Sequence, residues 1–288
     1  MKEIELIDMH THTKYSDGEL NPDELIIKAK NEGIKTLAIT DHDTLLGLKN
    51  ITINPKKEGI NLIKGIEVSI KVPKGRMHIL GYDININDEK LNQKMEELHN
   101  NSVYSIISLI SQLKKDYDIA FTTEEILDIL NRQSNIGRPD IARLLIKNKY
   151  VNSVQEAFDK YLIDAYEKCQ SSRKGITMEE GIKLIKEANG LAVLAHPITL
   201  KKSPEELDDL IGQLVSHGLD GIEVYHSEHS SQQSEEYLKL ANKYNLLISA
   251  GSDYHGPIVK PEIELGRGKN NIKIKQLSLV DKINSRKV

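Results

Sequence analysis

The sequence alternates between short apolar segments and amphipathic helical segments, and most of the apolar segments lead directly into histidine, aspartate or glutamate. Seven apolar segments are typical of buried β-strands: residues 4–9, 36–40, 61–68, 77–81, 191–195, 221–225 and 246–250. Strands that alternate with helices indicate an α/β fold built on a parallel sheet. In such folds the carboxyl ends of the strands meet at one edge, where active sites are built.

The first strand leads into a pair of histidines, His10 and His12, with Asp17 in a turn that Gly18 closes. Side chains alternate between the two faces of a strand, so the two imidazoles point the same way. Two imidazoles fixed on one rigid face are a ready pair of metal ligands, and Asp17 is close enough in sequence to return toward them. On its own, such a pair is more often a polar strand exit that has no metal.

The later strands repeat the pattern, because each predicted strand end carries residues of the types that bind metals. The full set is His10, His12, Asp17, His42, Glu67, His78, His196, Asp253 and His255. A single buried histidine is common in protein cores, but six histidines at the same end of successive strands need a shared explanation. The set therefore predicts a metal site at the strand ends. Asp41 and Asp43 flank His42, and either is a candidate to hold an imidazole, although Asp43 is also a candidate cap for a helix over residues 44–58 that Pro55 interrupts.

The alternation stops between residues 88 and 175, where the pattern is helical throughout. Apolar residues from Leu91 to Leu113 have the spacing of a long amphipathic helix, and further helix starts follow near residues 122, 138 and 153. About ninety helical residues between two strands exceed a normal crossover. We therefore expect a barrel domain formed by residues 1–87 and 176–288, interrupted by a helical domain over residues 88–175.

Charge and composition limit the partners. The formal net charge of the 288 residues is −4, which argues against wrapping duplex DNA but not against small anionic substrates. The apolar runs are all shorter than the roughly 20 residues of a membrane span, so no membrane association is expected. The single cysteine, Cys169, has no partner for an internal disulfide and fits a cytoplasmic protein.

Seven motifs occur in the same order as in the PHP (polymerase and histidinol phosphatase) family, which the chain resembles over about two hundred residues. They are His10-Thr-His12, Asp17-Gly18, Thr40-Asp41-His42-Asp43, Gly65-Ile66-Glu67, His78-Ile-Leu-Gly-Tyr82, Ala195-His196-Pro197 and Ser252-Asp253-Tyr-His255. The resemblance implies a distorted seven-stranded β/α barrel, similar to a TIM barrel, with three metal ions in its mouth. The insertion, which contains Gly137-Arg138-Pro139, resembles that of stand-alone PHP phosphoesterases acting on nucleoside 3′,5′-bisphosphates.

The resemblance also implies which residues hold each ion. His10, His12, Glu67 and Asp253 correspond to the ligands of the first ion; Glu67, His78 and His196 to those of the second; and Asp17, His42 and His255 to those of the third. Imidazole and carboxylate ligands without thiolate suit Mn²⁺, Zn²⁺ or Fe²⁺, and the resemblance favours Mn²⁺. Because no ligand position is missing, an enzyme is expected rather than a non-catalytic metal-binding PHP module.

The expected reaction is hydrolysis of a phosphomonoester, with the 3′-phosphate of a nucleoside 3′,5′-bisphosphate as the first choice of substrate. A hydroxide that bridges two ions would attack the phosphorus, with Glu67 and Asp253 among the catalytic residues. His226 is a candidate general acid or phosphate ligand, and otherwise a surface histidine in a polar loop. Arg138 is a candidate for the second phosphate, and otherwise part of an ordinary salt bridge; the insertion would form a lid. Histidinol phosphate and the 5′ end of short RNA remain alternative substrates.

Overall fold

The computed structural model of the protein describes residues 6–73, 75–130, 136–169, 175–267 and 278–286. The chain divides into two compact units. The first combines Met1–Gln93 with Ile176–Val288, and the second is Lys94–Gly175. Residues 4 and 5 of the predicted first strand lie outside the described residues.

The first unit is built on a sheet of seven strands in the order of the sequence, β1 to β7. The strands are β1 (Leu6–Asp8), β2 (Ile34–Ile39), β3 (Asn61–Ile70), β4 (Met77–Tyr82), β5 (Leu191–Leu194), β6 (Gly221–His226) and β7 (Leu247–Gly251). The first and last strands approach each other, since the Met9 N–H donates to Ala250 O at 3.1 Å and Thr11 pairs with Tyr254. The predicted α/β barrel with a helical insertion is thus confirmed, as a nearly closed barrel.

The direction of β4 differs from the expectation of parallel strands. β4 pairs antiparallel with both β3 and β5, whereas the other strand pairs are parallel. His78 therefore lies at the beginning of its strand, not at the carboxyl end as the repeated pattern predicted. Because the strand is reversed, its first residues reach the same edge as the carboxyl ends of the neighbours. His78 still lies opposite Ser69 of β3, two residues beyond Glu67.

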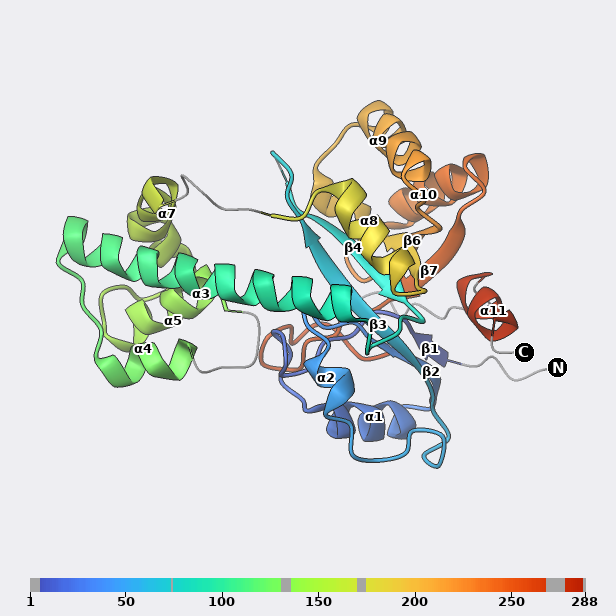
Figure 1. The fold of residues 1–288 in the computed structure, drawn as a ribbon, viewed down its shortest axis with the longest axis horizontal. Helices are drawn as coiled ribbons and strands as arrows, with labels where there is room; N and C mark the ends of the chain where they lie inside the picture. Colours follow the sequence, from blue (N-terminus) through green and yellow to red (C-terminus); the bar gives the residue numbers. More distant parts are fainter. Residues whose placement is uncertain (1–5, 74, 131–135, 170–174, 268–277, 287–288) are drawn as a thin grey trace. The chain divides into compact units, whose positions relative to one another are not determined.

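Helices cover the outside of this barrel, as Figure 1 shows for α8, α9 and α10 beside β4–β7 and for α1 and α2 beside β1 and β2. They are α1 (Pro22–Asn31), α2 (Leu46–Lys49), α8 (Met178–Glu187), the short 3₁₀ helix Pro197–Leu200, α9 (Pro204–Ser216), α10 (Ser231–Lys243) and α11 (Ser278–Ser285). A buried cluster that includes Met9, Leu80, Val193 and Leu279 fills the barrel below the strand ends that carry the histidines. Burial of such side chains stabilises the fold by about 1.5–3 kcal/mol each.

Local signals explain most of the helix starts but not the length of α2. Asn21 and Thr177 each form a reciprocal capping box with a glutamate three residues later, which satisfies main-chain N–H groups that have no partner within the helix. The helix expected over residues 44–58 is limited to Leu46–Lys49. Pro55 cannot donate a helical hydrogen bond, and Asn54 accepts main-chain N–H groups of the following turn.

The second unit consists of helices: most of α3 (Glu89–Tyr117), α4 (Thr123–Leu130), α5 (Arg138–Lys147), α6 (Val154–Ala157), a π-helical turn (Phe158–Leu162) and α7 (Ile163–Cys169). Figure 1 shows α4, α5 and α7 gathered along the second half of α3. Leu109, Leu113, Ile141, Leu145 and Leu162 are fully buried in a core of its own. The unit therefore buries its apolar faces among its own helices.

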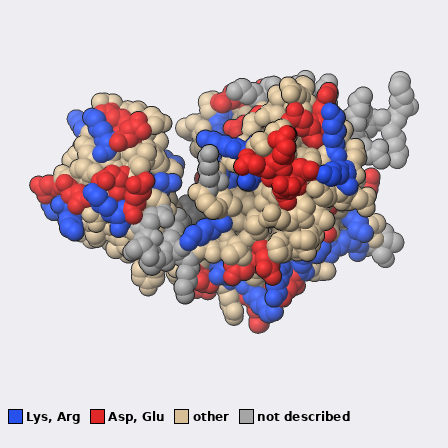
Figure 2. Space-filling model, turned by 90° about the horizontal axis from the view of Figure 1, so that it is seen from above, with Lys and Arg blue, Asp and Glu red and all other residues tan. Residues whose placement is uncertain are grey.

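Charged groups are mixed on the surface. On the face shown in Figure 2, acidic and basic side chains lie interspersed, in keeping with 43 acidic and 39 basic residues in the sequence. Every helix among the described residues is too short or too polar to span a bilayer.

Candidate metal centre

Six histidines and three acidic residues converge where the barrel strands reach one edge. His10 and His12 follow β1 directly, and both are completely buried. His42 follows β2 and pairs with Glu67 of β3, so the first three parallel strands deliver their polar side chains side by side. The antiparallel β4 adds His78, and the segments after β5 and β7 add His196, Asp253 and His255.

Glu67 is at the centre of the cluster, with a completely buried carboxylate. One oxygen, Oε2, lies 3.0, 3.2 and 3.3 Å from ring nitrogens of His10, His12 and His42. The other oxygen, Oε1, lies 2.7 Å from His78 Nδ1 and 2.8 Å from His196 Nε2. The two oxygens thus face two different groups of imidazoles, which is how a carboxylate that bridges two ions is arranged.

Two further carboxylates complete the cluster. Asp253 Oδ1 lies 3.1 Å from His12 Nε2 and 3.6 Å from His10 Nε2. Asp17 Oδ1 lies 3.2 Å from His255 Nε2 and 3.6 Å from His12 Nδ1. These distances bring all nine sequence-predicted ligand candidates into one connected set.

Ligand atoms close enough to share an ion form four overlapping groups among the described residues. They are His10/His12/Glu67/Asp253, His42/Glu67/His78, His12/Asp17/His42/His255 and His10/Glu223/His226. The first group matches the expected first set. The second group has His42 where His196 was expected, and the third adds His12 to the expected Asp17, His42 and His255.

Two buried ring nitrogens show that the cluster suits metal ions. His12 Nε2 and His42 Nδ1 make no hydrogen bond among the described residues. Each nevertheless lies about 3.2–3.3 Å from Glu67 Oε2. Buried polar atoms normally have a hydrogen-bond partner, and two ring nitrogens that lack one beside a shared carboxylate have the chemistry of ligands to divalent ions. The residues present therefore fit the metal ions that the motifs imply.

The electrostatics of the protein alone are dominated by the buried carboxylates. Burial alone would raise the pKa of Glu67, but the adjacent His42, His10 and His78 hold it well below its usual range. Burial alone would lower the pKa of His12, but Asp253 and Glu67 raise it to about 10. Burial lowers the pKa of His42 to about 3, so that ring is neutral and able to act as a ligand. The site concentrates negative charge that cations can compensate.

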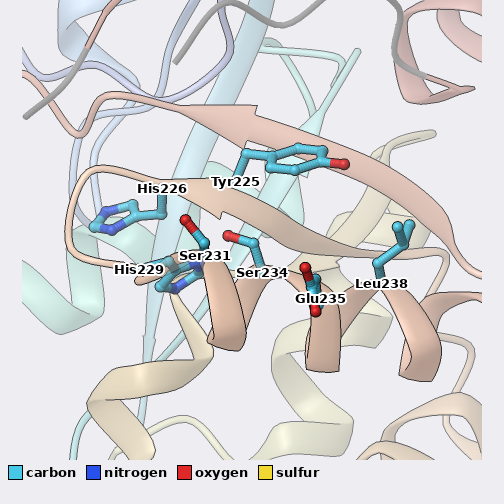
Figure 3. Close-up of a pocket in the computed structure, with 7 residues that line it drawn as sticks. All are labelled: Tyr225, His226, His229, Ser231, Ser234, Glu235 and Leu238. Carbon is cyan, nitrogen blue, oxygen red and sulfur yellow. The ribbon is translucent and has the colours of Figure 1, made fainter. Parts of the chain in front are cut away.

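His226, at the end of β6, lies at the border of the cluster. Its Nε2 is 3.5 Å from Asp253 Oδ2, and its Nδ1 accepts the Glu228 N–H at 3.1 Å. Because Nδ1 accepts, the proton of a neutral ring is on Nε2, which faces the cluster. His226 also lines a pocket of about 270 Å³ between the end of β6 and α10. Figure 3 shows His226 and His229 at one end of this pocket, with Tyr225 facing the α10 side chains.

Arg138 belongs to the other unit, at the first position of α5. Its guanidinium lies 4.2 Å from the ring centre of Tyr166 and 5.4 Å from that of Phe158. Among the described residues, aromatic contacts orient its planar group. Its role toward a substrate stays a prediction.

Two charged residues near the cluster, Lys260 and Asp41, had no firm role from the sequence. Lys260 donates to Asp253 Oδ2 at 2.5 Å, although it lies in a lysine-rich region without a sequence motif. Asp41 accepts from Thr13 N at 2.7 Å and from Ser16 Oγ at 2.7 Å, and so supports the turn beside His12.

Glu223 is completely buried, and its carboxylate contacts His10 and the main chain at His196. The available sequence signal was its place on the predicted strand that leads to His226, but His10 and His196, its partners, are distant in sequence. Asp43, by contrast, accepts the Ser69 main-chain N–H at 2.8 Å, and α2 begins without a side-chain cap, so the capping role considered for Asp43 is wrong.

Comparison with known proteins gives consistent matches along the chain. The PHP domain matches residues 8–273. The 5′-3′ exoribonuclease Rnm of Escherichia coli is 31% identical over 268 residues, covering 91% of this chain and 88% of that protein. The 3′,5′-nucleoside bisphosphate phosphatase of Chromobacterium violaceum is 28% identical, covering 87% of each chain. A crystal structure from Bifidobacterium adolescentis, assigned as a metal-dependent phosphoesterase, has a TM-score of 0.79 at 27% identity and covers 99% of this chain and 97% of its own.

Proposed function

The chain belongs to the PHP domain family and is a metal-dependent phosphoesterase, and from this premise we propose that it removes the 3′-phosphate of nucleoside 3′,5′-bisphosphates with three divalent ions. The observation that carries the proposal is the convergence of the nine predicted ligands into one connected set, in which five imidazoles face the two oxygens of Glu67. The relative from Chromobacterium violaceum supports the choice of substrate. The cytoplasmic location of the present chain stays a prediction.

The residues proposed to hold the ions are the nine ligand candidates expected from the sequence, with Glu67 shared between the first ion and the second. Bound ions would make a water molecule more acidic and neutralise charge on the phosphate oxygens. Imidazole and carboxylate donors suit Mn²⁺, our first choice, as well as Zn²⁺ and Fe²⁺.

The chain itself supplies a proton donor and a substrate clamp in this proposal. His226 carries its proton on Nε2, next to Asp253, and would donate it to the leaving oxygen or to a phosphate oxygen. Arg138, whose fork is oriented by Tyr166 and Phe158, would bind the phosphate that is not transferred.

A panel of phosphate esters tests the choice of substrate. With Mn²⁺ present, phosphate release should be fastest from 3′-phosphoadenosine 5′-phosphate and slower from histidinol phosphate and p-nitrophenyl phosphate. A 5′-phosphorylated RNA trinucleotide tests the second candidate, the 5′-3′ exoribonuclease activity named for the Escherichia coli relative. Mononucleotide release from that RNA at the highest kcat/KM of the panel would replace the bisphosphatase assignment.

Replacing Arg138 with alanine should reduce kcat/KM for a bisphosphorylated nucleotide by roughly 10- to 100-fold, because a charge-assisted contact contributes about 1.5–3 kcal/mol. The rate with p-nitrophenyl phosphate, which has no second phosphate, should change little. Arg138→Lys keeps the charge but loses the planar fork. Its kcat/KM for the bisphosphorylated nucleotide should lie between the values of the wild type and of Arg138→Ala. Steady-state kinetics of both substrates provide the measurement, and equal losses on both would contradict the clamp.

A further inference from the structure

Glu223 touches two parts of the candidate metal centre with one carboxylate. The residue is on β6 and is completely buried. Its Oε1 lies 3.0 Å from His10 Nδ1, and its Oε2 accepts the main-chain N–H of His196 at 2.7 Å. These two partners belong to different proposed ion sites, since His10 is among the candidates for the first ion and His196 among those for the second.

The contact with His10 fixes which ring nitrogen carries the proton. An ionised carboxylate only accepts hydrogen bonds, so His10 must be protonated on Nδ1. Nε2 is then the ring nitrogen that would bind an ion, and it lies 3.0 Å from Glu67 Oε2 and 3.6 Å from Asp253 Oδ1. Ligand histidines in metal sites are generally held by a carboxylate in this way.

The contact with His196 fixes the main chain where β5 ends. His196 has φ 22° and ψ 70°, a conformation that a residue with a side chain seldom adopts. The N–H donated to Glu223 holds the peptide in this turn, and the side chain then places Nε2 at 2.8 Å from Glu67 Oε1. Strained main chain of this kind persists only where surrounding contacts fix it.

We propose that Glu223 is a positioning residue that sets the ring of His10 and the turn at His196 together, and so couples the first two ion sites. The inference rests on the proposed metal-dependent function. The ligand atoms of Glu223, His10 and His226 are also close enough to one another to share an ion. Both of its oxygens already accept N–H donors, however, so it supports ligands and does not bind a fourth ion.

Glu223→Gln tests this role with almost no change in shape. An amide has one acceptor, so its NH₂ group must face either the His196 N–H or His10 Nδ1. The first arrangement sets donor against donor, and the second moves the proton of His10 to Nε2, the atom meant for the metal. We expect a 10- to 100-fold weaker apparent affinity for Zn²⁺, measured by calorimetric titration of the full chain and by metal content after dialysis.

Tyr82→Phe is the matched control. Tyr82 is also completely buried in the barrel, and its hydroxyl donates to Met9 O at 2.8 Å, so removal of this group costs a buried hydrogen bond. This control should lose stability but keep the Zn²⁺ affinity of the wild type. Equal Zn²⁺ affinity of Glu223→Gln and the wild type would overturn the positioning role, whereas a wild type that binds no divalent ion would overturn the proposed function as well.

The tautomer can be read in the unmodified protein, which keeps the test valid if Glu223→Gln fails to fold. Nitrogen-15 NMR of the histidine rings in the Zn²⁺-loaded protein should show His10 with its proton on Nδ1, assigned by comparison with a His10→Gln sample. A proton on Nε2 of His10 would overturn the inference, because Glu223 would then have no N–H to accept from that ring.

Discussion

Glu67→Gln should abolish measurable phosphoesterase activity and remove bound metal together, while the barrel remains folded. The substitution keeps the shape of the side chain but removes the charge that faces five imidazoles at 2.7–3.3 Å. Loss of one charge-stabilising group in an active site already costs roughly 100- to 1,000-fold in rate, and Glu67 is proposed to serve two ions. We therefore expect a loss on the order of 1,000-fold or more in kcat.

Phosphate release and metal content of the purified variant check this prediction. Glu205→Gln provides the matched control, because Glu205 is an exposed residue in the first turn of α9. The control should keep both metal and activity. Retention of two or more ions per chain by Glu67→Gln, with activity within 10-fold of the wild type, would show that Glu67 does not bridge ions.

Gly251→Ala should have the second-largest effect, because it acts on the position of His10. A methyl group at residue 251 would lie 2.2 Å from His10 Cβ and 2.5 Å from His10 N, and neither atom belongs to a flexible side-chain end. Relief of the overlap must move the strand end that carries His10. Overpacking of this kind costs about 1–3 kcal/mol of unfolding free energy, and a shift of 1 Å in a catalytic group costs roughly 100-fold in rate.

Denaturant unfolding and phosphate release should therefore both respond to Gly251→Ala. Gly212→Ala on α9 is the control, because the nearest atom to its new methyl group is the hydroxyl oxygen of Tyr244 at 3.3 Å, and alanine is the better helix former. That control should leave activity unchanged. An active Gly251→Ala variant with wild-type stability would show that the approach of β7 to His10 is less tight than described.

Features set by local sequence could be predicted. The strand period placed His10 and His12 on one side, and the capping signals at Asn21 and Thr177 located helix starts. The helical pattern of residues 88–175 indicated an insertion, although the predicted boundaries and the lid role of that segment stay predictions. These features depend on neighbours within a few residues, where sequence patterns carry the physical cause.

Features set by distant partners could not be predicted. A short apolar strand has no pattern that reveals its direction, so the reversal of β4 and the resulting place of His78 required the neighbouring strands. Glu223 lies 213 residues from His10, and Lys260 contacts Asp253 through a turn without a motif. The early end of the helix expected after Asp43 is an exception, because its cause, the turn at Asn54 and Pro55, is local in the sequence.

Removal and return of metal is the most direct test of the proposed trinuclear centre. Protein purified without chelator should contain more than one transition-metal ion per chain by elemental analysis, and up to three after incubation with Mn²⁺. Dialysis against a chelator should abolish phosphate release from 3′-phosphoadenosine 5′-phosphate, and added Mn²⁺ should restore it. Full activity of protein shown by elemental analysis to be free of metal would contradict the account.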